Sequence, residues 1–298
     1  MNHDHAHAPA NYDKAFAIGI ALNVSYVVVE AFFGVLAHSL ALIADAGHNL
    51  TDVLSLLLAW GASRLSQMQP TKRYTYGLRS SSILASLTNA IILLIAIGAI
   101  AWEAIRRFNQ PQEIPGGTVM IVAAFGVVIN AATALLFVKG RKSDLNIKGA
   151  FLHMAADAGV SLGVVVAGFA IFRTGLYWID PATSLVIVAI IAVGTWGLLR
   201  DSARLALQAV PPDIDANKVK EYLATLPDVV GVHDLHIWPM STTETALTAH
   251  LEMPDGGGGD EFLHHVCKHL HDQFRIEHCT IQIEQNAEAC SLAPEENV

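Results

Sequence analysis

The chain has 298 residues, of which 53% are hydrophobic and only 15% charged, with a formal net charge of −9. A soluble domain usually carries about 25% charged residues, so the composition excludes an ordinary soluble protein. Residues 1–210 carry 11 acidic and 14 basic residues, whereas residues 211–298 carry 16 and 4. We therefore expect an apolar domain of net charge +3 joined near Pro211 to a small acidic domain of net charge −12.

The N-terminal tail, residues 1–13, contains three histidines at alternate positions in the sequence MNHDHAHAPANYD. It has no basic segment followed by an apolar core, so it is not typical of a signal peptide. Two interpretations of these histidines stand side by side: weak metal collection, or a solvated and disordered end.

Six apolar runs follow, each close to the ~20 residues that a membrane-spanning helix needs. We expect them at residues 14–36, 40–63, 80–105, 116–138, 149–172 and 179–199. Lys and Arg are concentrated in the loops after the second and fourth runs and at the end of the sixth. By the positive-inside rule, these ends and both termini lie in the cytoplasm. We therefore expect a multi-pass protein of the cell (inner or plasma) membrane.

Ionisable residues interrupt the second and fifth runs. His48 and Asp52 are four residues apart in ADAGHNLTD, and His153 and Asp157 repeat that spacing. Residues four apart share one face of a helix, although each ionisable group costs several kcal/mol in a bilayer. Two facing pairs would supply the two imidazoles and two carboxylates of a tetrahedral zinc site. The two negative charges would then cancel those of the ion, so we predict a transport metal site here.

Other polar residues in the runs have a simpler interpretation. A single buried Asp or Asn in a spanning helix often makes a helix–helix hydrogen bond. This interpretation is favoured for Asn23, Asn89 and Asn130. For Asp45 and Asn49 it stands beside an auxiliary role near the metal site.

After Pro212 the pattern predicts helix, strand, strand, helix and strand within fewer than 90 residues. The expected fold is thus an all-α six-helix transmembrane domain at 14–210 and a small α+β domain at 211–298. The αββαβ order is ferredoxin-like or metallochaperone-like, and the domain is too small for a catalytic cleft of its own. Cys267, Cys279 and Cys290 match no disulfide framework, so free thiols in a reducing compartment are expected.

The paired motifs, the six spans and the segments HDLHIW, TAHLEM and IEHCTIQIE closely resemble the cation diffusion facilitator family of zinc exporters. The resemblance implies a homodimer that exports Zn²⁺ or similar divalent ions from the cytoplasm in exchange for protons. It implies a transport site on four residues: His48, Asp52, His153 and Asp157. Some relatives have Asp in place of the first His and tolerate Cd²⁺, so the histidine here favours zinc.

The resemblance also implies that the soluble domain binds zinc as a regulatory ligand, in a cytoplasmic sensor that tightens the dimer. The implied ligands are His233, His250, His278 and Glu284, with His236 and Cys290 as auxiliary residues. Two loops depart from the family pattern. Many relatives have a His-rich loop between the fourth and fifth spans, whereas VKGRKSDLNIKG has no His. Some bacterial relatives have an Asp/His metal site between the second and third spans, whereas QMQPTKRYTYGLR has neither residue, so we expect no metal there.

Three other functions compete with export. An intramembrane zinc hydrolase needs an open coordination position and a general base, and no HExxH motif occurs. A passive metal channel needs no obligatory proton exchange, and a membrane-tethered metal sensor would give no flux. The sequence has no phosphate-binding loop, so it predicts a secondary transporter rather than an enzyme, with no nucleotide or nucleic-acid partner.

Overall fold

The computed structural model describes residues 13–66, 68–109, 112–138 and 145–285, and it leaves the side chains of some of them, Asp52 among these, undescribed. The chain divides into two compact units. One comprises Met1–Leu57 and Ala90–Trp196, and the other comprises Leu58–Asn89 and Gly197–Val298.

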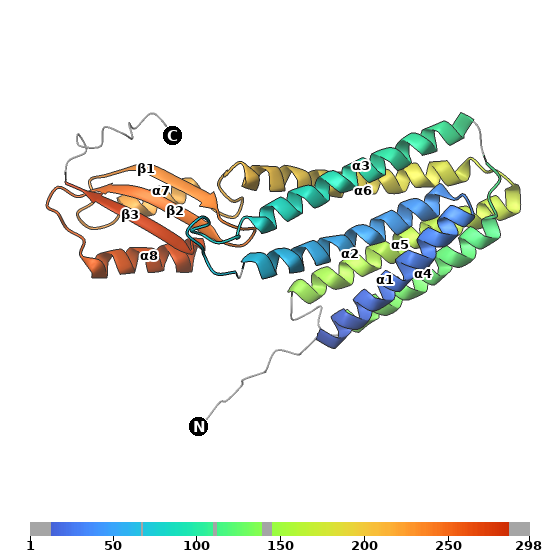
Figure 1. The fold of residues 1–298 in the computed structure, drawn as a ribbon, viewed down its shortest axis with the longest axis horizontal. Coiled ribbons are helices and arrows are strands. Elements are labelled where there is room, and N and C mark those ends of the chain that lie inside the picture. The colour runs from blue at the N-terminus through green and yellow to red at the C-terminus, as the bar shows by residue number, and fades with distance from the viewer. Residues whose placement is uncertain (1–12, 67, 110–111, 139–144, 286–298) are drawn as a thin grey trace, which may run out of the picture. The chain divides into compact units, whose positions relative to one another are not determined.

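Six long helices occupy the positions of the six predicted apolar runs (Figure 1). They are α1 (Asp13–Leu36), α2 (Leu40–Ser66), α3 (Ser81–Asn109), α4 (Gly116–Phe137), α5 (Leu145–Thr174) and α6 (Ile179–Ala206). Their lengths run from 22 to 30 residues. At a rise of about 1.5 Å per residue, each is long enough for a hydrocarbon core of about 30 Å.

The helices carry the apolar surface that a bilayer requires. Among the described residues, five of them, α1 and α3 to α6, are long and apolar enough to cross a membrane. Helix α2, which contains Asp45, His48 and Asn49, is not in this group, and the side chains of part of its C-terminal half are not described. Outward-facing aliphatic side chains such as Val193, 78% exposed, suit contact with lipid.

Close packing holds the helices of the first unit together. Helix α4 packs along α5 and against α1. A Cβ added at Gly168 of α5 would lie only 2.7 Å from the Met120 nitrogen of α4, so this glycine lets the two backbones approach. Buried side chains including Leu42 of α2 and Val164 of α5 form the core. The two helices with the paired motifs are therefore held in one packed bundle.

The start of α2 is fixed by a residue distant in the sequence. The Asp180 carboxylate of α6 accepts hydrogen bonds from the Leu40 nitrogen at 2.7 Å and the Ala41 nitrogen at 3.2 Å, and from the Ser39 hydroxyl. A carboxylate at a helix N-terminus satisfies otherwise unpaired amide groups and interacts favourably with the helix dipole. This cap sets where α2 begins and therefore where His48 lies along it.

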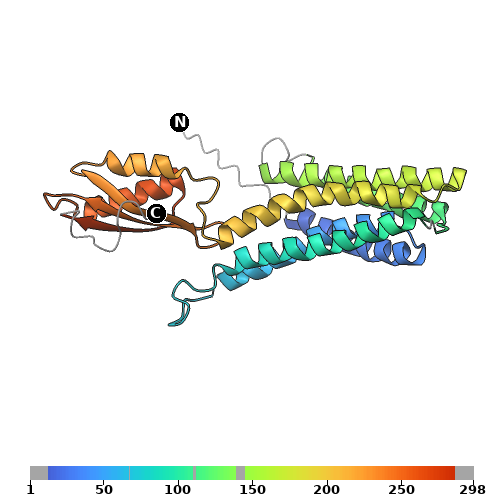
Figure 2. The same cartoon turned by 90° about the horizontal axis from the view of Figure 1, so that it is seen from above.

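The second unit contains the predicted αββαβ domain. Its elements are α7 (Ala216–Ala224), β1 (Gly231–Pro239), β2 (Thr245–Glu252), α8 (Asp260–Phe274) and β3 (His278–Glu284). The strand order is β1-β2-β3, with β1 antiparallel and β3 parallel to β2 (Figure 1). Both helices of this domain lie on the same face of the sheet (Figure 2). A parallel pair needs a crossover connection, which α8 supplies. Leu223 of α7, Leu247 and Leu251 of β2, and Val266 of α8 share one core with both helices.

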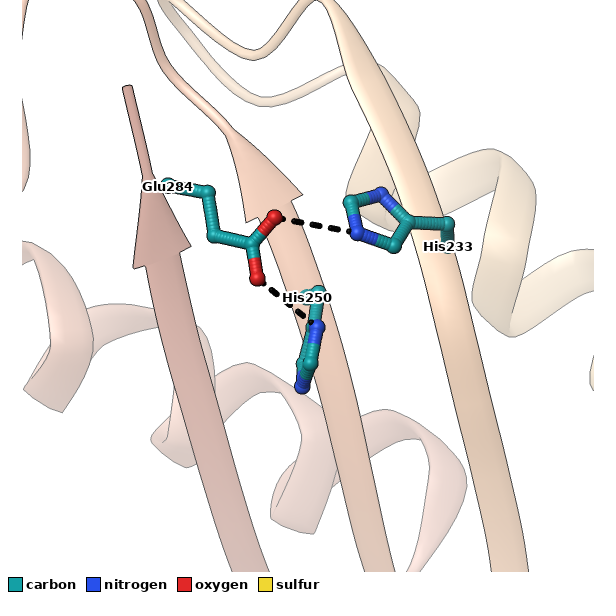
Figure 3. A group of neighbouring side chains, drawn as sticks. All are labelled: His233, His250 and Glu284. Carbon is teal, nitrogen blue, oxygen red and sulfur yellow. Dashed lines mark ion pairs between the residues drawn. The ribbon is translucent and has the colours of Figure 1, made fainter. Parts of the chain in front are cut away.

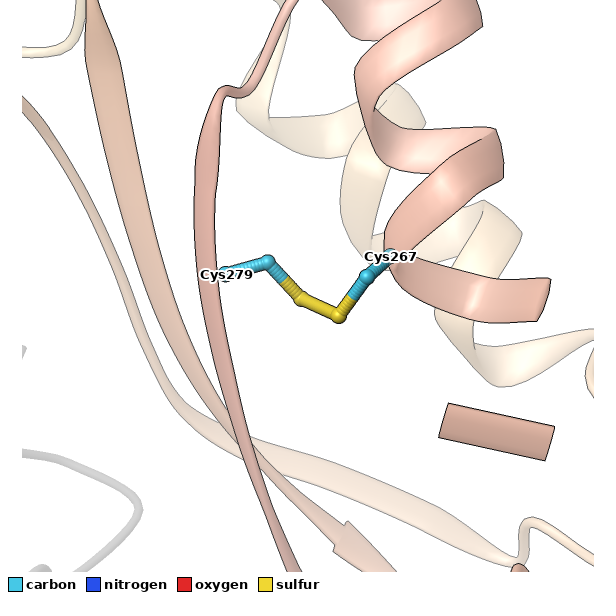
Figure 4. The surroundings of a disulfide bond; sticks show 2 residues. All are labelled: Cys267 and Cys279. Carbon is cyan, nitrogen blue, oxygen red and sulfur yellow. A yellow bond between two sulfur atoms is a disulfide. The ribbon is translucent and has the colours of Figure 1, made fainter. Parts of the chain in front are cut away.

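The structure corrects the expectation of free thiols. Cys267 of α8 and Cys279 of β3 form a disulfide across Cα atoms 5.8 Å apart (Figure 4). Sequence spacing did not reveal this pair, because it depends on how α8 packs beside β3. Cys290 lies outside the described residues. Reduced cysteines therefore give no support to the expected orientation, which rests on the Lys and Arg distribution alone.

Candidate metal-binding sites

Three residues of the predicted transport site converge between α2 and α5. His48 Nε2 lies 3.2 Å from Asp157 Oδ1, and His153 Nε2 lies 3.8 Å from Asp157 Oδ2. The two imidazole rings meet edge to face with centroids 6.4 Å apart. We call His48, His153 and Asp157 the helix group. Asp52 lies one turn after His48 on α2, and its side chain is not described.

The burial of the helix group favours cation binding. The Asp157 side chain is 2% exposed, whereas those of His48 and His153 are 18% and 44% exposed. The Oδ2 atom of Asp157 is buried and makes no hydrogen bond to the described residues. A buried carboxylate oxygen without a donor is unfavourable, and a bound divalent ion would compensate for it.

Asp45 and Asn49, the auxiliary residues, make hydrogen bonds to other helices. Asp45 Oδ2 accepts from the Ser161 hydroxyl of α5 at 2.8 Å, so the helix–helix hydrogen bond considered for Asp45 is present. Asn49 Nδ2 donates to Glu30 Oε2 of α1 at 3.2 Å. Sequence reasoning overlooked Glu30, which is fully buried. The available signal was a lone glutamate within the first apolar run.

A second group of potential ligands lies on the three-stranded sheet. The register pairs His233 of β1 with His250 of β2, and it places Glu284 of β3 beside Glu252. His233 Nε2 lies 3.1 Å from Glu284 Oε2, and His250 Nδ1 lies 2.9 Å from Glu284 Oε1 (Figure 3). One ligand atom from each residue lies within 4.8 Å of the others. We call His233, His250 and Glu284 the sheet group.

Side-chain alternation explains why these residues meet. Leu247, Ala249 and Leu251 of β2 enter the core with the two helices, so His250 points to the opposite face of the sheet. His233 Nε2 and Glu284 Oε2 are buried and close but not aligned for a hydrogen bond. This is the geometry of atoms that surround a common point, and two imidazoles with a carboxylate suit Zn²⁺.

A β-bulge adds a residue that the sequence analysis did not single out. The register shifts between His233 and His236, where Asp234 adopts a left-handed φ of 49°. Its Oδ2 atom lies 3.3 Å from His250 Nε2, and its Oδ1 atom lies 2.8 Å from His236 Nε2. Bulges often re-aim side chains beside functional sites. Asp234 thus connects the auxiliary His236 to the sheet group. Its position between two histidines in the sequence HDLH was the feature that could have predicted this role.

His278 is not part of the sheet group. Because β3 is parallel to β2, His278 pairs with Ala246 at the opposite end of the strand from Glu284. Six residues of strand separate the two by about 20 Å, so within one chain they cannot share an ion. The His278 ring instead meets Tyr76 edge to face, with centroids 5.5 Å apart. Cys290, the other auxiliary residue, lies outside the described residues.

Long apolar helices that enclose a polar group, followed by a small α+β domain, are typical of a multi-pass membrane protein. Two family descriptions match the chain: the cation efflux transmembrane domain over residues 16–205, and the cytoplasmic domain of cation efflux proteins over residues 211–286. The chain therefore belongs to the cation efflux family.

Several characterised relatives span nearly the same length. The metal cation efflux system protein CzcD of Cupriavidus metallidurans is 34% identical over 95% of this chain and 89% of its own length. The zinc transporter ZitB of Escherichia coli is 33% identical over 95% of this chain and 93% of its own. The cadmium, cobalt and zinc/H⁺-K⁺ antiporter of Bacillus velezensis is 31% identical over 96% and 93%.

Proposed function

We propose that the chain exports Zn²⁺ from the cytoplasm across the cell membrane in exchange for protons. The cargo binds a tetrahedral site of His48, Asp52, His153 and Asp157 between α2 and α5. The observation that carries this proposal is the convergence of the helix group at 3.2 and 3.8 Å on one buried carboxylate. The names of the relatives, a zinc transporter and a zinc/H⁺-K⁺ antiporter, support the cargo and the exchange.

Exchange with protons follows from the chemistry of the ligands. Zinc binds when both carboxylates are ionised and both imidazoles are neutral. After zinc leaves, two bare carboxylates in an apolar bundle are unfavourable unless protons or water replace the ion. Protonation on the outward side therefore expels zinc, and deprotonation towards the cytoplasm restores the ligands.

The second domain, residues 211–298, acts in this proposal as a regulatory zinc sensor and dimerisation domain. The fit rests on the sheet group, whose ligand atoms lie within 4.8 Å of one another. His233, His250 and Glu284 would hold the ion, with Asp234 and His236 beside it. A bound cation lowers the repulsion between acidic domains and so favours the homodimer. Both termini lie in the cytoplasm in this arrangement, as the Lys and Arg distribution predicts.

Zinc flux in proteoliposomes tests the exchange directly. Purified full-length protein is reconstituted with a pH dye inside the vesicles, and zinc uptake is followed with and without an imposed pH gradient. We expect zinc and protons to move in opposite directions, and a pH jump alone to drive zinc uptake. Zinc flux that is indifferent to the gradient would favour a passive channel, and absence of flux would favour a tethered sensor.

A further inference from the structure

Two carboxylic acids lie buried together beside the helix group. Glu30 of α1 and Asp45 of α2 are both 0% exposed. Glu30 accepts a hydrogen bond from Asn49 at 3.2 Å, and Asn49 lies four residues after Asp45 on the same face of α2, so the two carboxyl groups lie in one buried cluster. Asp45 precedes His48 by three residues, so it lies almost one helical turn from that ligand. Two adjacent buried carboxylates cannot both be ionised without a large cost.

The hydrogen bonds around the pair show where a proton is needed. Glu30 Oε1 accepts from the Tyr26 hydroxyl at 2.6 Å, and Oε2 accepts from Asn49 Nδ2 at 3.2 Å. Asp45 Oδ2 accepts from Ser161 Oγ at 2.8 Å, whereas Asp45 Oδ1 is buried without a donor among the described residues. Ionised carboxylates only accept hydrogen bonds. The donors around the two acids are neutral, so two negative charges in this buried cluster would be uncompensated, and a proton on one of the acids is favoured.

No Lys or Arg faces the pair among the described residues. The titratable groups that act on it are the Tyr26 phenol of α1 and, through space, His48 of α2 and Asp157 of α5. Helix α4, which packs on α1, contains no titratable residue. The titratable residues of α3 lie in its C-terminal part. The negative charge of the pair is therefore reduced by a proton rather than by a basic side chain.

The packing of α4 preserves this arrangement. A Cβ added at Gly126 would overlap the hydroxyl of Tyr26. Glycine at this position thus leaves room for the ring that donates to Glu30, and Val122 of the same helix accepts a second, longer contact from Tyr26 at 3.4 Å. The pair is part of a built polar site rather than a chance approach of two acids.

We propose that Glu30 and Asp45 form a proton-holding site, separate from the metal ligands, whose single shared proton is displaced when zinc binds the helix group. The inference rests on the proposed function. Asp45 shares α2 with His48, and its partner Ser161 shares α5 with Asp157. Zinc binding neutralises two carboxylates about one turn away, so the pair then meets less negative charge and the loss of its proton is favoured relative to the empty, ionised site. The O–H bond then breaks and the proton passes to water; it returns when zinc leaves.

The test counts the protons released per zinc ion bound. Zinc is titrated calorimetrically into full-length protein in buffers of different ionisation enthalpy. Glu30→Gln keeps the shape and can donate permanently to Asp45, so it mimics the protonated pair. We expect Glu30→Gln to release roughly one proton fewer per zinc than the wild type. Its zinc affinity should also gain about tenfold less per unit rise in pH.

Glu103→Gln serves as the matched control. It makes the same change on α3, at a residue that pairs with Arg106 and Arg107, and should release as many protons as the wild type. If Glu30→Gln fails to fold, Asp45→Asn and the infrared signal of a protonated carboxylic acid, lost on zinc addition to the wild type, give the same information.

The outcomes separate this inference from the proposed function. A wild-type protein that binds zinc without releasing any proton would contradict the exchange itself. A wild type that exchanges normally, with an unchanged proton count in both Glu30→Gln and Asp45→Asn, would overturn only the proton-holding site.

Discussion

The helix group and the sheet group use nearly the same ligands in different surroundings. Each contains two imidazoles and one shared carboxylate, with contacts of 3.2 and 3.8 Å in the first and 3.1 and 2.9 Å in the second. The helix group lies among apolar helices and beside the buried acids Glu30 and Asp45. The sheet group lies on the face of the sheet away from the core. The ligands of the sheet group are themselves 9% to 16% exposed, so the two groups differ in the buried acids beside the first rather than in access to water. In the proposed function, protons replace an ion that leaves the helix group, whereas the sheet group holds a regulatory ion.

The strongest test of this comparison removes the shared carboxylate of the helix group. Asp157→Asn retains the shape but deletes a ligand and half of the compensating charge, so zinc flux should fall about 100-fold or more. Flux is measured in proteoliposomes, with folding checked by thermal unfolding. Asp201→Asn, at a residue on α6 whose side chain is 51% exposed, is the matched control and should transport normally. Near wild-type flux in Asp157→Asn would exclude Asp157 as a ligand.

The sequence was sufficient to predict the features that depend on local periodicity. Apolar runs located all six long helices. The spacing of His48 with Asp52 and of His153 with Asp157 led to the proposed transport site, and three of these four residues converge in the structure. Alternation located the three strands. What it could not supply depends on register and packing. Only the parallel pairing of β3 with β2 places Glu284 rather than His278 near His250, and only the bulge at Asp234 turns the Asp234 carboxylate towards His250.

Helix packing explains the remaining gaps. The disulfide between Cys267 and Cys279 requires α8 to lie beside β3, and the hydrogen bond from Asn49 that brings Glu30 near Asp45 requires α1 to lie beside α2. Neither pair shows a spacing that favours contact, because each joins different elements. A lone acid in an apolar run signals that a partner exists without identifying it.

The second prediction removes the sheet group instead. His250→Ala combined with Glu284→Ala should abolish regulatory zinc binding, because the two side chains provide two of the three converging ligands. Equilibrium dialysis of the full-length protein should then detect about one site fewer per chain. Transport at saturating zinc should persist at a reduced rate, since these residues lie outside the proposed transport site. Thr280→Ala, on an exposed position of β3, is the control. Complete loss of transport with intact folding would place the sheet group on the transport route.

The third prediction changes the chemistry of the helix group without emptying it. His48→Asp replaces an imidazole with an oxygen ligand, which weakens the preference for a tetrahedral, nitrogen-containing site. We expect the ratio of Cd²⁺ to Zn²⁺ flux to rise several-fold while transport continues. Competition assays with both ions in proteoliposomes measure this ratio. An unchanged ranking of the two metals would contradict a selective role for His48.

The smallest effect on transport is expected from loss of the disulfide. This change separates the stability of the domain at residues 211–298 from its ability to bind metal. Cys267 and Cys279 are separated by 12 residues, and closing a loop of this size stabilises a domain by about 3 kcal/mol. Cys267→Ser should therefore lower the protection of α8 and β3 against hydrogen exchange in the full-length protein. Reduction of the wild type should have the same effect. Because Cys279 pairs with Leu247, several residues along the strands from His250 and Glu284, the sheet group should still bind zinc and restore part of the lost protection by mass action. Loss of zinc binding in Cys267→Ser would instead mean that the disulfide holds the zinc ligands in place. The strand register would then be insufficient to position the sheet group without the disulfide.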